Sequence, residues 1–188
     1  IVADRMNRSL AHWLLPGGRV LDAGTAEAAA GGLDPEADAD ISHDAPAYIY
    51  YTSGSTGPAK GVVDSHRNVM HNVARYTHAL QIGEQARLTL LQSCGFSGAV
   101  SNIFGALLNG AALLPFDVRR HGVAALARWL AAAEPTIYHS VPSLFRQVVD
   151  TGVALPTLRV IRIEGDLGGA PDVERFQRHF NRPGQAHC

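Results

Sequence analysis

The stretch Tyr51-Thr-Ser-Gly-Ser-Thr-Gly-Pro-Ala-Lys60-Gly61 is the most unusual part of the sequence. It joins two short apolar runs, 47–52 and 61–64, that have the composition of β-strands. Its glycines let backbone N–H groups turn toward one point, and its hydroxyls add further hydrogen-bond donors. Lys60 is the only lysine of the chain and adds a positive charge on a flexible stem. These features suit a cradle for a triphosphate, but composition alone is explained about equally well by a flexible polar hairpin tip.

The stretch does not follow the pattern of a P-loop. That pattern requires Gly-x-x-x-x-Gly-Lys-Ser/Thr followed by a helix. Here Gly57 is followed by Pro58, Ala59 and Lys60, and then by a strand. The sequence therefore disfavours a P-loop switch or ATPase.

Outward from this stretch, apolar runs alternate with segments of helical periodicity. The alternation predicts an α/β fold of layered sheets with helices on both faces, and buried strands on either side of the loop. We expect strands over 47–52, 61–64, 87–92, 111–115, 136–139 and 158–163. We expect helices over 66–80, 97–109, 122–133, 141–149 and 171–180.

Composition excludes several classes of protein. The net charge of the 188 residues is −1 and the basic residues are scattered, which argues against a nucleic-acid partner. No apolar run approaches the roughly 20 residues that span a bilayer, and no signal-peptide pattern opens the chain. Two cysteines, Cys94 and Cys188, cannot build a disulfide framework, so we expect a cytoplasmic location.

The distribution of charged residues suggests that the chain has two parts. No Lys or Arg occurs from 20 to 59, where Ala, Gly and acidic residues dominate before the first strand. We therefore expect residues 1–44 to form a flanking helix and strand with an acidic connector. Residues 45–188 are expected to form an α/β subdomain that binds nucleotide phosphates.

Residues 51–61 resemble the phosphate-loop signature Y-T-S-G-S-T-G-x-P-K-G of the adenylate-forming (AMP-binding) superfamily. This superfamily contains acyl-CoA synthetases, luciferases and the adenylation domains of nonribosomal peptide synthetases. The order of Pro58 and Ala59 is reversed relative to the signature, while the Gly-to-Lys spacing is kept. The stretch identifies the chain as similar to an internal fragment of the large N-terminal domain of such an enzyme.

The resemblance continues downstream over residues 45–180. Residues 96–111 are similar to the motif F-D-x-S-V that leads into a helix reading F-G-A-L-L-x-G-A. Residues 141–145 resemble the V-P-S/T segment, and residues 158–166 resemble the strand L-R-x-x-x-x-G-G-E. Two such motifs at suitable spacing argue against a chance match in an unrelated phosphate-binding domain.

The resemblance implies an enzyme that activates a carboxylic acid with ATP and Mg²⁺, forming an acyl-adenylate and pyrophosphate. A thiol, from CoA or from phosphopantetheine on a carrier protein domain, then takes the acyl group. Lys60 would be the catalytic residue, stabilising charge on the departing pyrophosphate. The residues implied in binding the ATP phosphates are Thr52, Ser53, Gly54, Ser55, Thr56, Gly57 and Lys60.

The same resemblance implies an acyl pocket lined by Phe96, Ser97, Ser101, His139 and Glu164. Ser97 stands where members that activate α-amino acids carry an Asp that pairs with the ammonium group. An aryl, fatty or keto acid, or an unusual amino acid, is therefore the expected substrate. Glu164 could replace the missing carboxylate. Each residue also has a plainer explanation: Ser97 as a helix cap, His139 as a strand-end histidine and Glu164 as a solvated side chain.

Several parts of the family pattern do not occur in this sequence. A Y-G-P-T-E-like motif and the ribose-binding Asp are missing, and no His/Cys spacing suits a metal, so no metal site is expected in this fragment. We therefore expect the isolated chain not to turn over. A degenerate, non-catalytic nucleotide-binding module is the alternative, which the Pro58-Ala59 reversal and Ser97 favour mildly.

Overall fold

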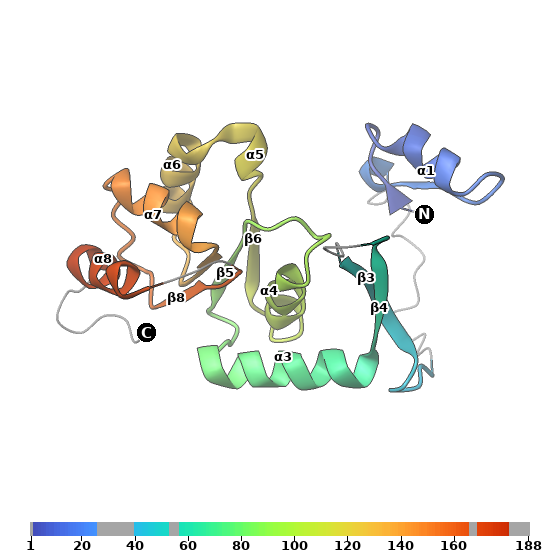
Figure 1. The fold of residues 1–188 in the computed structure, drawn as a ribbon, viewed down its shortest axis with the longest axis horizontal. Helices are drawn as coiled ribbons and strands as arrows, with labels where there is room; N and C mark the ends of the chain where they lie inside the picture. Colours follow the sequence, from blue (N-terminus) through green and yellow to red (C-terminus); the bar gives the residue numbers. More distant parts are fainter. Residues whose placement is uncertain (1, 26–39, 53–56, 166–168, 181–188) are drawn as a thin grey trace. The chain divides into compact units, whose positions relative to one another are not determined.

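The computed structural model describes residues 2–25, 40–52, 57–165 and 169–180 (Figure 1). The chain divides into two compact units, Ile1–Ile41 and Ser42–Cys188. In the first unit, β1 (Val2–Ala3) pairs in parallel with β2 (Leu21–Asp22), with α1 (Arg8–Leu14) between them in sequence and the 3-10 helix η1 (Ala23–Thr25) after them. Most of the expected acidic connector falls on 26–39, outside the described residues.

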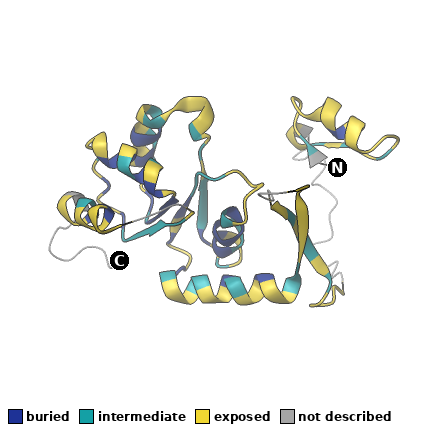
Figure 2. Ribbon diagram, in the orientation of Figure 1, coloured by how far each residue is buried: buried dark blue, intermediate teal, exposed yellow. Residues whose placement is uncertain are grey.

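The second unit begins with an antiparallel hairpin of β3 (Pro46–Thr52) and β4 (Lys60–Ser65). The expectation that these two strands are buried is wrong, because Ile49 and Tyr51 are 55% and 70% exposed, and Figure 2 shows the hairpin largely in the exposed colour. In this two-stranded sheet, alternate side chains point to opposite faces. Tyr48 and Tyr50 pack against a cluster formed by helices α3 (His66–Leu80) and α4 (Gly98–Leu107), whereas Ile49 and Tyr51 on the opposite face are exposed.

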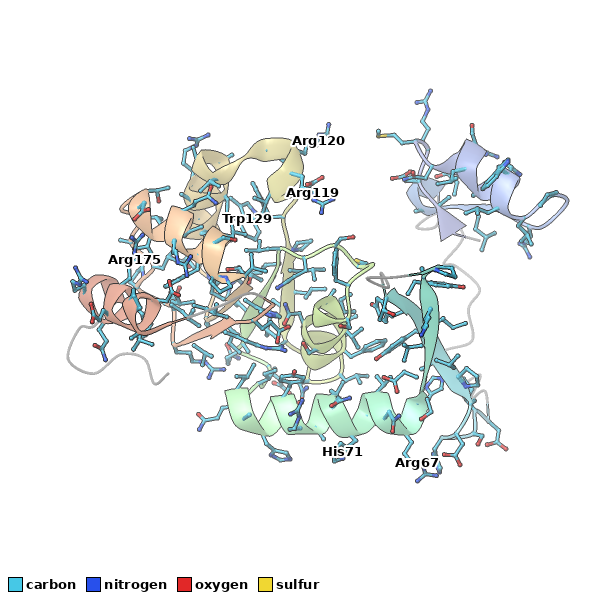
Figure 3. All side chains as sticks on the ribbon, in the orientation of Figure 1. Arg67, His71, Arg119, Arg120, Trp129 and Arg175 are labelled. Carbon is cyan, nitrogen blue, oxygen red and sulfur yellow. The ribbon has the colours of Figure 1, made fainter. Side chains whose placement is uncertain are left out.

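Helix α3 (His66–Leu80) follows the hairpin directly. The Ser65 side chain accepts a hydrogen bond from the backbone N–H of Asn68 at 3.3 Å, which is the expected N-cap. The helix buries Val69 and Val73, whereas Arg67 and His71 are exposed on its outer side (Figure 3).

A four-stranded parallel sheet forms the centre of the second unit. Its strands are β5 (Arg87–Leu90), β6 (Ala112–Pro115), β7 (Ile137–Ser140) and β8 (Val160–Ile163), in the spatial order β6-β5-β7-β8. The helices between them are α4 (Gly98–Leu107), α5 (Val118–His121), α6 (Val123–Ala133), α7 (Pro142–Asp150) and, after β8, α8 (Ala170–Phe180). Parallel strands need such crossovers, since a tight turn cannot join them.

Both faces of this sheet are covered, as expected. Ile137 on β7 packs with Leu88 and Ala106 on the α4 side. Its neighbour Tyr138 packs with Phe145 on the α7 side of the sheet, in a hydrophobic cluster to which α6 and α8 also contribute side chains. Every residue of β7 is buried, so β7 runs through the middle of the core.

Two expectations about the elements need correction. The short helix α5 was not expected, and its Asp117 accepts a hydrogen bond from the Arg120 N–H at 3.1 Å as a local cap. Ser97 occupies the cap position of α4 but makes no capping hydrogen bond with its side chain, so capping does not explain this serine. Within the described ranges, no helix combines the length and the apolar character needed to cross a bilayer.

Candidate functional site

The two ends of the expected phosphate loop lie side by side. Thr52 and Lys60 are partners in the β3–β4 register, and Thr52 Oγ1 donates a hydrogen bond to the carbonyl oxygen of Lys60 at 3.4 Å. Thr52, Gly57 and Lys60 are exposed. The remaining expected phosphate ligands, Ser53, Gly54, Ser55 and Thr56, lie outside the described residues. The hairpin therefore closes the loop at its base.

Three of the five expected acyl-pocket residues line one cavity. Ser97, Ser101 and Glu164 border a cavity of about 300 Å³, which the side chains of Tyr76 and Arg162 also border. Phe96, which is 62% exposed, borders a second cavity of about 570 Å³. Ser97 and Glu164 border both cavities, so the two spaces meet at these residues.

The larger cavity lies at the carboxyl ends of three parallel strands. Its lining includes residues that follow β5, β7 and β8 in sequence: Gln92, Val141 and Gly165. Arg119, labelled on α5 in Figure 3, also borders it. Open α/β sheets commonly bind their ligands at this edge.

Glu164 and Arg162 form the polar centre of the smaller cavity. Arg162 donates hydrogen bonds to Glu164 Oε2, to Ser101 Oγ at 2.6 Å and to Tyr76 Oη at 2.7 Å. Its guanidinium carbon also lies 4.0 Å from the centroid of the Tyr76 ring. The side chain of Arg162 is 12% exposed and that of Glu164 is 39% exposed. Glu164 is therefore a partly exposed, ion-paired wall of the cavity.

His139 does not border either cavity but lies against Glu164. Its side chain is 1% exposed, and its Nε2 lies 3.0 Å from Glu164 Oε1. Asn102 Nδ2 donates to the carbonyl oxygen of Thr89 at 3.0 Å, so its Oδ1, 3.1 Å from His139 Nδ1, accepts from that ring nitrogen. In the neutral ring, Nε2 then carries a lone pair that faces another acceptor, and this contact is not a hydrogen bond. A proton that enters this pair would lie between Nε2 and Oε1.

Burial and two neighbouring charges act on the pKa of His139. Burial, reinforced by the Arg162 charge, lowers the pKa of His139 to about 4, while Glu164 acts in the opposite direction. The imidazole is therefore neutral at neutral pH, and its Nε2 lone pair adds no attraction for the Glu164 carboxylate, which Arg162 holds. The strand-end explanation fits the position of His139 near the end of β7.

The sequence reasoning missed Arg162 and Tyr76. Arg162 precedes Glu164 by two residues on one extended segment, so both side chains point to the same face. This alternation was readable from the sequence once Glu164 had been placed. Tyr76 belongs to α3, 86 residues before Arg162, and only the tertiary packing brings them together.

Metal ligands are not gathered anywhere in the part of the chain that the structure describes. Within those ranges, no group of three or more His, Cys, Asp or Glu residues could hold an ion.

The sequence of this chain is similar to those of known proteins. The sequence model of the family described as AMP-binding enzyme matches residues 6–187. The anguibactin system regulator of Vibrio anguillarum is 32% identical over 152 residues, which cover 78% of this chain and 14% of that protein. Syringomycin synthase SyrB1 of Pseudomonas syringae pv. syringae is 39% identical over 125 residues, which cover 64% of this chain and 20% of that protein.

A solved structure agrees over nearly the whole chain. The nonribosomal peptide synthetase FmoA3, in its alpha-methyl-L-serine-AMP-bound form, matches 95% of this chain and 20% of its own with a TM-score of 0.80 and 26% identity. The chain thus spans a fifth or less of the length of these relatives.

Proposed function

Because the chain belongs to the AMP-binding enzyme family, we propose that it is part of an ATP-dependent ligase that activates a carboxylic acid as its acyl-adenylate. The observation that carries this proposal is the loop 51–61 on the β3–β4 hairpin. Its glycines and hydroxyls lie between Thr52 and Lys60, which are paired partners at its base. Backbone N–H groups and hydroxyls that converge on one point suit the binding of a polyphosphate, and the composition of 51–61 supports this role.

The proposed chemistry transfers an adenylyl group. A carboxylate oxygen of the acid attacks the α-phosphorus of ATP, the bond from that phosphorus to the bridging oxygen breaks, and pyrophosphate leaves with the negative charge. Lys60 would stabilise this departing charge, and Thr52, Ser53, Gly54, Ser55, Thr56 and Gly57 would bind the β- and γ-phosphates. Mg²⁺ would enter with the nucleotide and neutralise part of the phosphate charge.

The acceptor of the acyl group is proposed to be a thiol. The similarity to nonribosomal peptide synthetase FmoA3 supports phosphopantetheine on a carrier protein domain over CoA. In this proposal residues 45–188 supply the phosphate site and one wall of the acyl pocket. The two adjoining cavities would take the acid: Phe96 borders one, Ser101 borders the other, and Ser97 and Glu164 border both, with His139 behind Glu164.

The alternative is a degenerate module that binds nucleotide without catalysis. The reversed Pro58-Ala59 pair and Ser97 are the features that favour it. ATP–pyrophosphate exchange by the full-length protein, across a panel of carboxylic acids, separates the two functions. The ligase predicts exchange that depends on one class of acid. Nucleotide binding without exchange for any acid would favour the degenerate module.

A further inference from the structure

Arg119 and Arg120, the adjacent arginines of α5, are both exposed (Figure 3). Within the described ranges, neither guanidinium donates a hydrogen bond or forms an ion pair. By contrast, Arg67 and Arg162 each pair with a carboxylate. Asp117 begins the same segment, but it accepts from the backbone N–H of Arg120 at 3.1 Å. The two side chains of α5 therefore offer free positive charge to an anion.

Arg119 borders two cavities at the carboxyl edge of the parallel sheet. One is the cavity of about 570 Å³ that is proposed to receive part of the acid. The other has a volume of about 470 Å³ and lies at the carboxyl ends of β5 and β6. The two cavities share Leu91, Gln92, Ser93 and Arg119, so they meet along residues 91–93 and at α5.

The walls of the 470 Å³ cavity are mostly apolar. Its apolar side chains are Leu90, Leu91, Pro115, Phe116 and Val118. The other lining residues are Gln92, Ser93, Cys94, Asp117 and Arg119. Phe116 packs against Trp129 of α6 with 4.9 Å between the ring centroids, which fixes this part of the wall. The cavity thus combines apolar surface, a few hydrogen-bonding groups and a free cation.

We propose that this cavity and the two arginines bind the phosphopantetheine arm of the acceptor, with Arg119 and Arg120 on its phosphate. The inference rests on the proposed function, in which that arm carries the thiol. The arm joins a phosphate to a thiol through a chain that bears methyl groups and amides, so it matches apolar walls with a cation at their border. Because the thiol must reach the acyl-adenylate, its path has to meet the acid cavity, and the 470 Å³ cavity does so at residues 91–93.

The two arginines are positioning residues for the transfer of the acyl group. In that step the sulfur attacks the carbonyl carbon of the acyl-adenylate and forms the thioester bond. The bond from that carbon to the phosphate oxygen breaks, AMP leaves with the electron pair, and the thiol proton passes to water. Arg119 and Arg120 would hold the phosphate at the far end of the arm and take no part in the bond changes.

The phosphates of ATP are the alternative anion for these arginines. The apolar walls of the 470 Å³ cavity disfavour ATP, since they would cover a polyanion without offering it hydrogen-bond donors. Glycines and hydroxyls, which suit a polyphosphate, gather instead in the loop 51–61. An effect of the arginines on ATP is therefore an outcome that contradicts the proposal.

The test compares 4′-phosphopantetheine with pantetheine, which lacks only the phosphate, as acceptors for the full-length protein. Thioester formation is followed with an acid that supports pyrophosphate exchange. The KM of phosphopantetheine should be about five- to tenfold lower than that of pantetheine, because each exposed ion pair contributes up to about fivefold. Added salt should reduce this preference, since it screens exposed charges.

Two contrary results have different meanings. Equal KM values for the two thiols would overturn the inference and leave the ligase function standing. No exchange with any acid, together with no shift in melting temperature on adding ATP, would remove the proposed function itself. Titration calorimetry covers the case in which neither thiol is acylated: phosphopantetheine that binds no more tightly than pantetheine would overturn the inference as well.

Variants test the role of the two arginines. Arg119→Ala/Arg120→Ala should raise the KM of phosphopantetheine to that of pantetheine, and Arg119→Lys/Arg120→Lys should keep part of the preference because it keeps the charges. Arg128→Ala is the control, since it removes an exposed arginine of α6 that borders neither cavity. A double alanine variant that retains the preference, or that raises the KM of ATP instead, would contradict the proposal.

Discussion

Glu164 Oε1 lies 2.9 Å from the point that a β-carbon at Gly98 would occupy. Side-chain carbons and carboxylate oxygens do not approach so closely, so the position of Glu164 depends on glycine at residue 98. The carboxylate is held there by Arg162 on one oxygen and contacts His139 with the other. This relationship links the start of α4 to the segment after β8 and leads to the first prediction.

Gly98→Ala should displace the Glu164 carboxylate and weaken recognition of the acid. We expect kcat/KM for the acid to fall by up to about tenfold, because the end of the Glu164 side chain has to move by only a few tenths of an ångström and a misplacement of about 1 Å costs about 100-fold. The KM of ATP should not change. Gly83→Ala is the control, since a β-carbon there meets nothing within 4 Å. Equal kinetics for the two variants would show that Glu164 does not need this space.

His139 should make stability depend on pH. Its pKa is lowered to about 4 in the folded protein, whereas an unfolded histidine takes up a proton near pH 6.5. Between these values the unfolded state binds the extra proton, so the free energy of unfolding falls as pH falls from about 6.5 to about 4. The loss is up to about 3 kcal/mol.

Urea unfolding at pH 7 and at pH 4.5 measures this loss. His139→Gln should show a smaller decrease than the wild type. His71→Gln, which changes an exposed histidine on α3, should behave like the wild type. Identical decreases for wild type and His139→Gln would exclude His139 as the source.

The Arg146–Asp172 ion pair should stabilise the contact between α7 and α8. Arg146 Nε and Nη2 donate to the two carboxylate oxygens at 2.6 and 2.8 Å, and the Gly169 N–H donates at 3.1 Å. The hydrogen bonds from Arg146, which have the largest effect, and the one from Gly169 lower the pKa of Asp172 to about 2 from its usual 3.8. The stabilisation is complete above pH 4 and is lost as pH falls from about 3.8 toward 2.

Asp172→Asn should therefore lower the melting temperature at pH 7, and the difference from wild type should shrink toward pH 2. Glu174→Gln provides a control, because its partner Arg178 is exposed and such pairs contribute little. A melting temperature unaffected by Asp172→Asn at pH 7 would mean that the pair is not stabilising.

Lys60→Ala in the full-length protein should slow adenylate formation by about 10- to 1,000-fold, the range for loss of one charge stabiliser. Pyrophosphate exchange at saturating acid measures this rate. Arg67→Ala removes another exposed cation of the same unit, paired with Asp44 at 2.8 Å, and should leave the rate unchanged. Equal rates for Lys60→Ala and wild type would count against the role of Lys60.

Local signals predicted the elements well. Ser65 before 66–80 and Pro142 in the first turn of α7 are chemical boundary markers, and both act as expected. The strands 87–92 and 136–139 were apparent from their apolar runs, and the structure confirms them with ends shifted by one or two residues. Each of these features depends only on residues that are neighbours in the sequence, so it can be predicted from the sequence alone.

Contacts between distant segments were harder to predict. The apolar run Tyr48–Tyr51 predicts a buried strand. In the structure this run belongs to a two-stranded hairpin that packs against helices on one face only, and Tyr51 on the other face is exposed. The triangle of Tyr76, Ser101 and Arg162 joins α3, α4 and β8. Its formation depends on the order β6-β5-β7-β8, which periodicity alone does not specify. Glu164 was placed by resemblance, whereas its partner Arg162 required the structure.

The central claim is that the hairpin loop binds the phosphates of ATP with Lys60 at its end. An acyl phosphate of ATP tests it directly, because such a reagent transfers its acyl group to an amine beside the terminal phosphate, with ATP as the leaving group. Lys60 is the only lysine in these 188 residues, so mass spectrometry assigns any acylated lysine of this segment without ambiguity. The account predicts acylation of Lys60 that excess ATP suppresses; absent acylation, or acylation that ATP does not reduce, would contradict it.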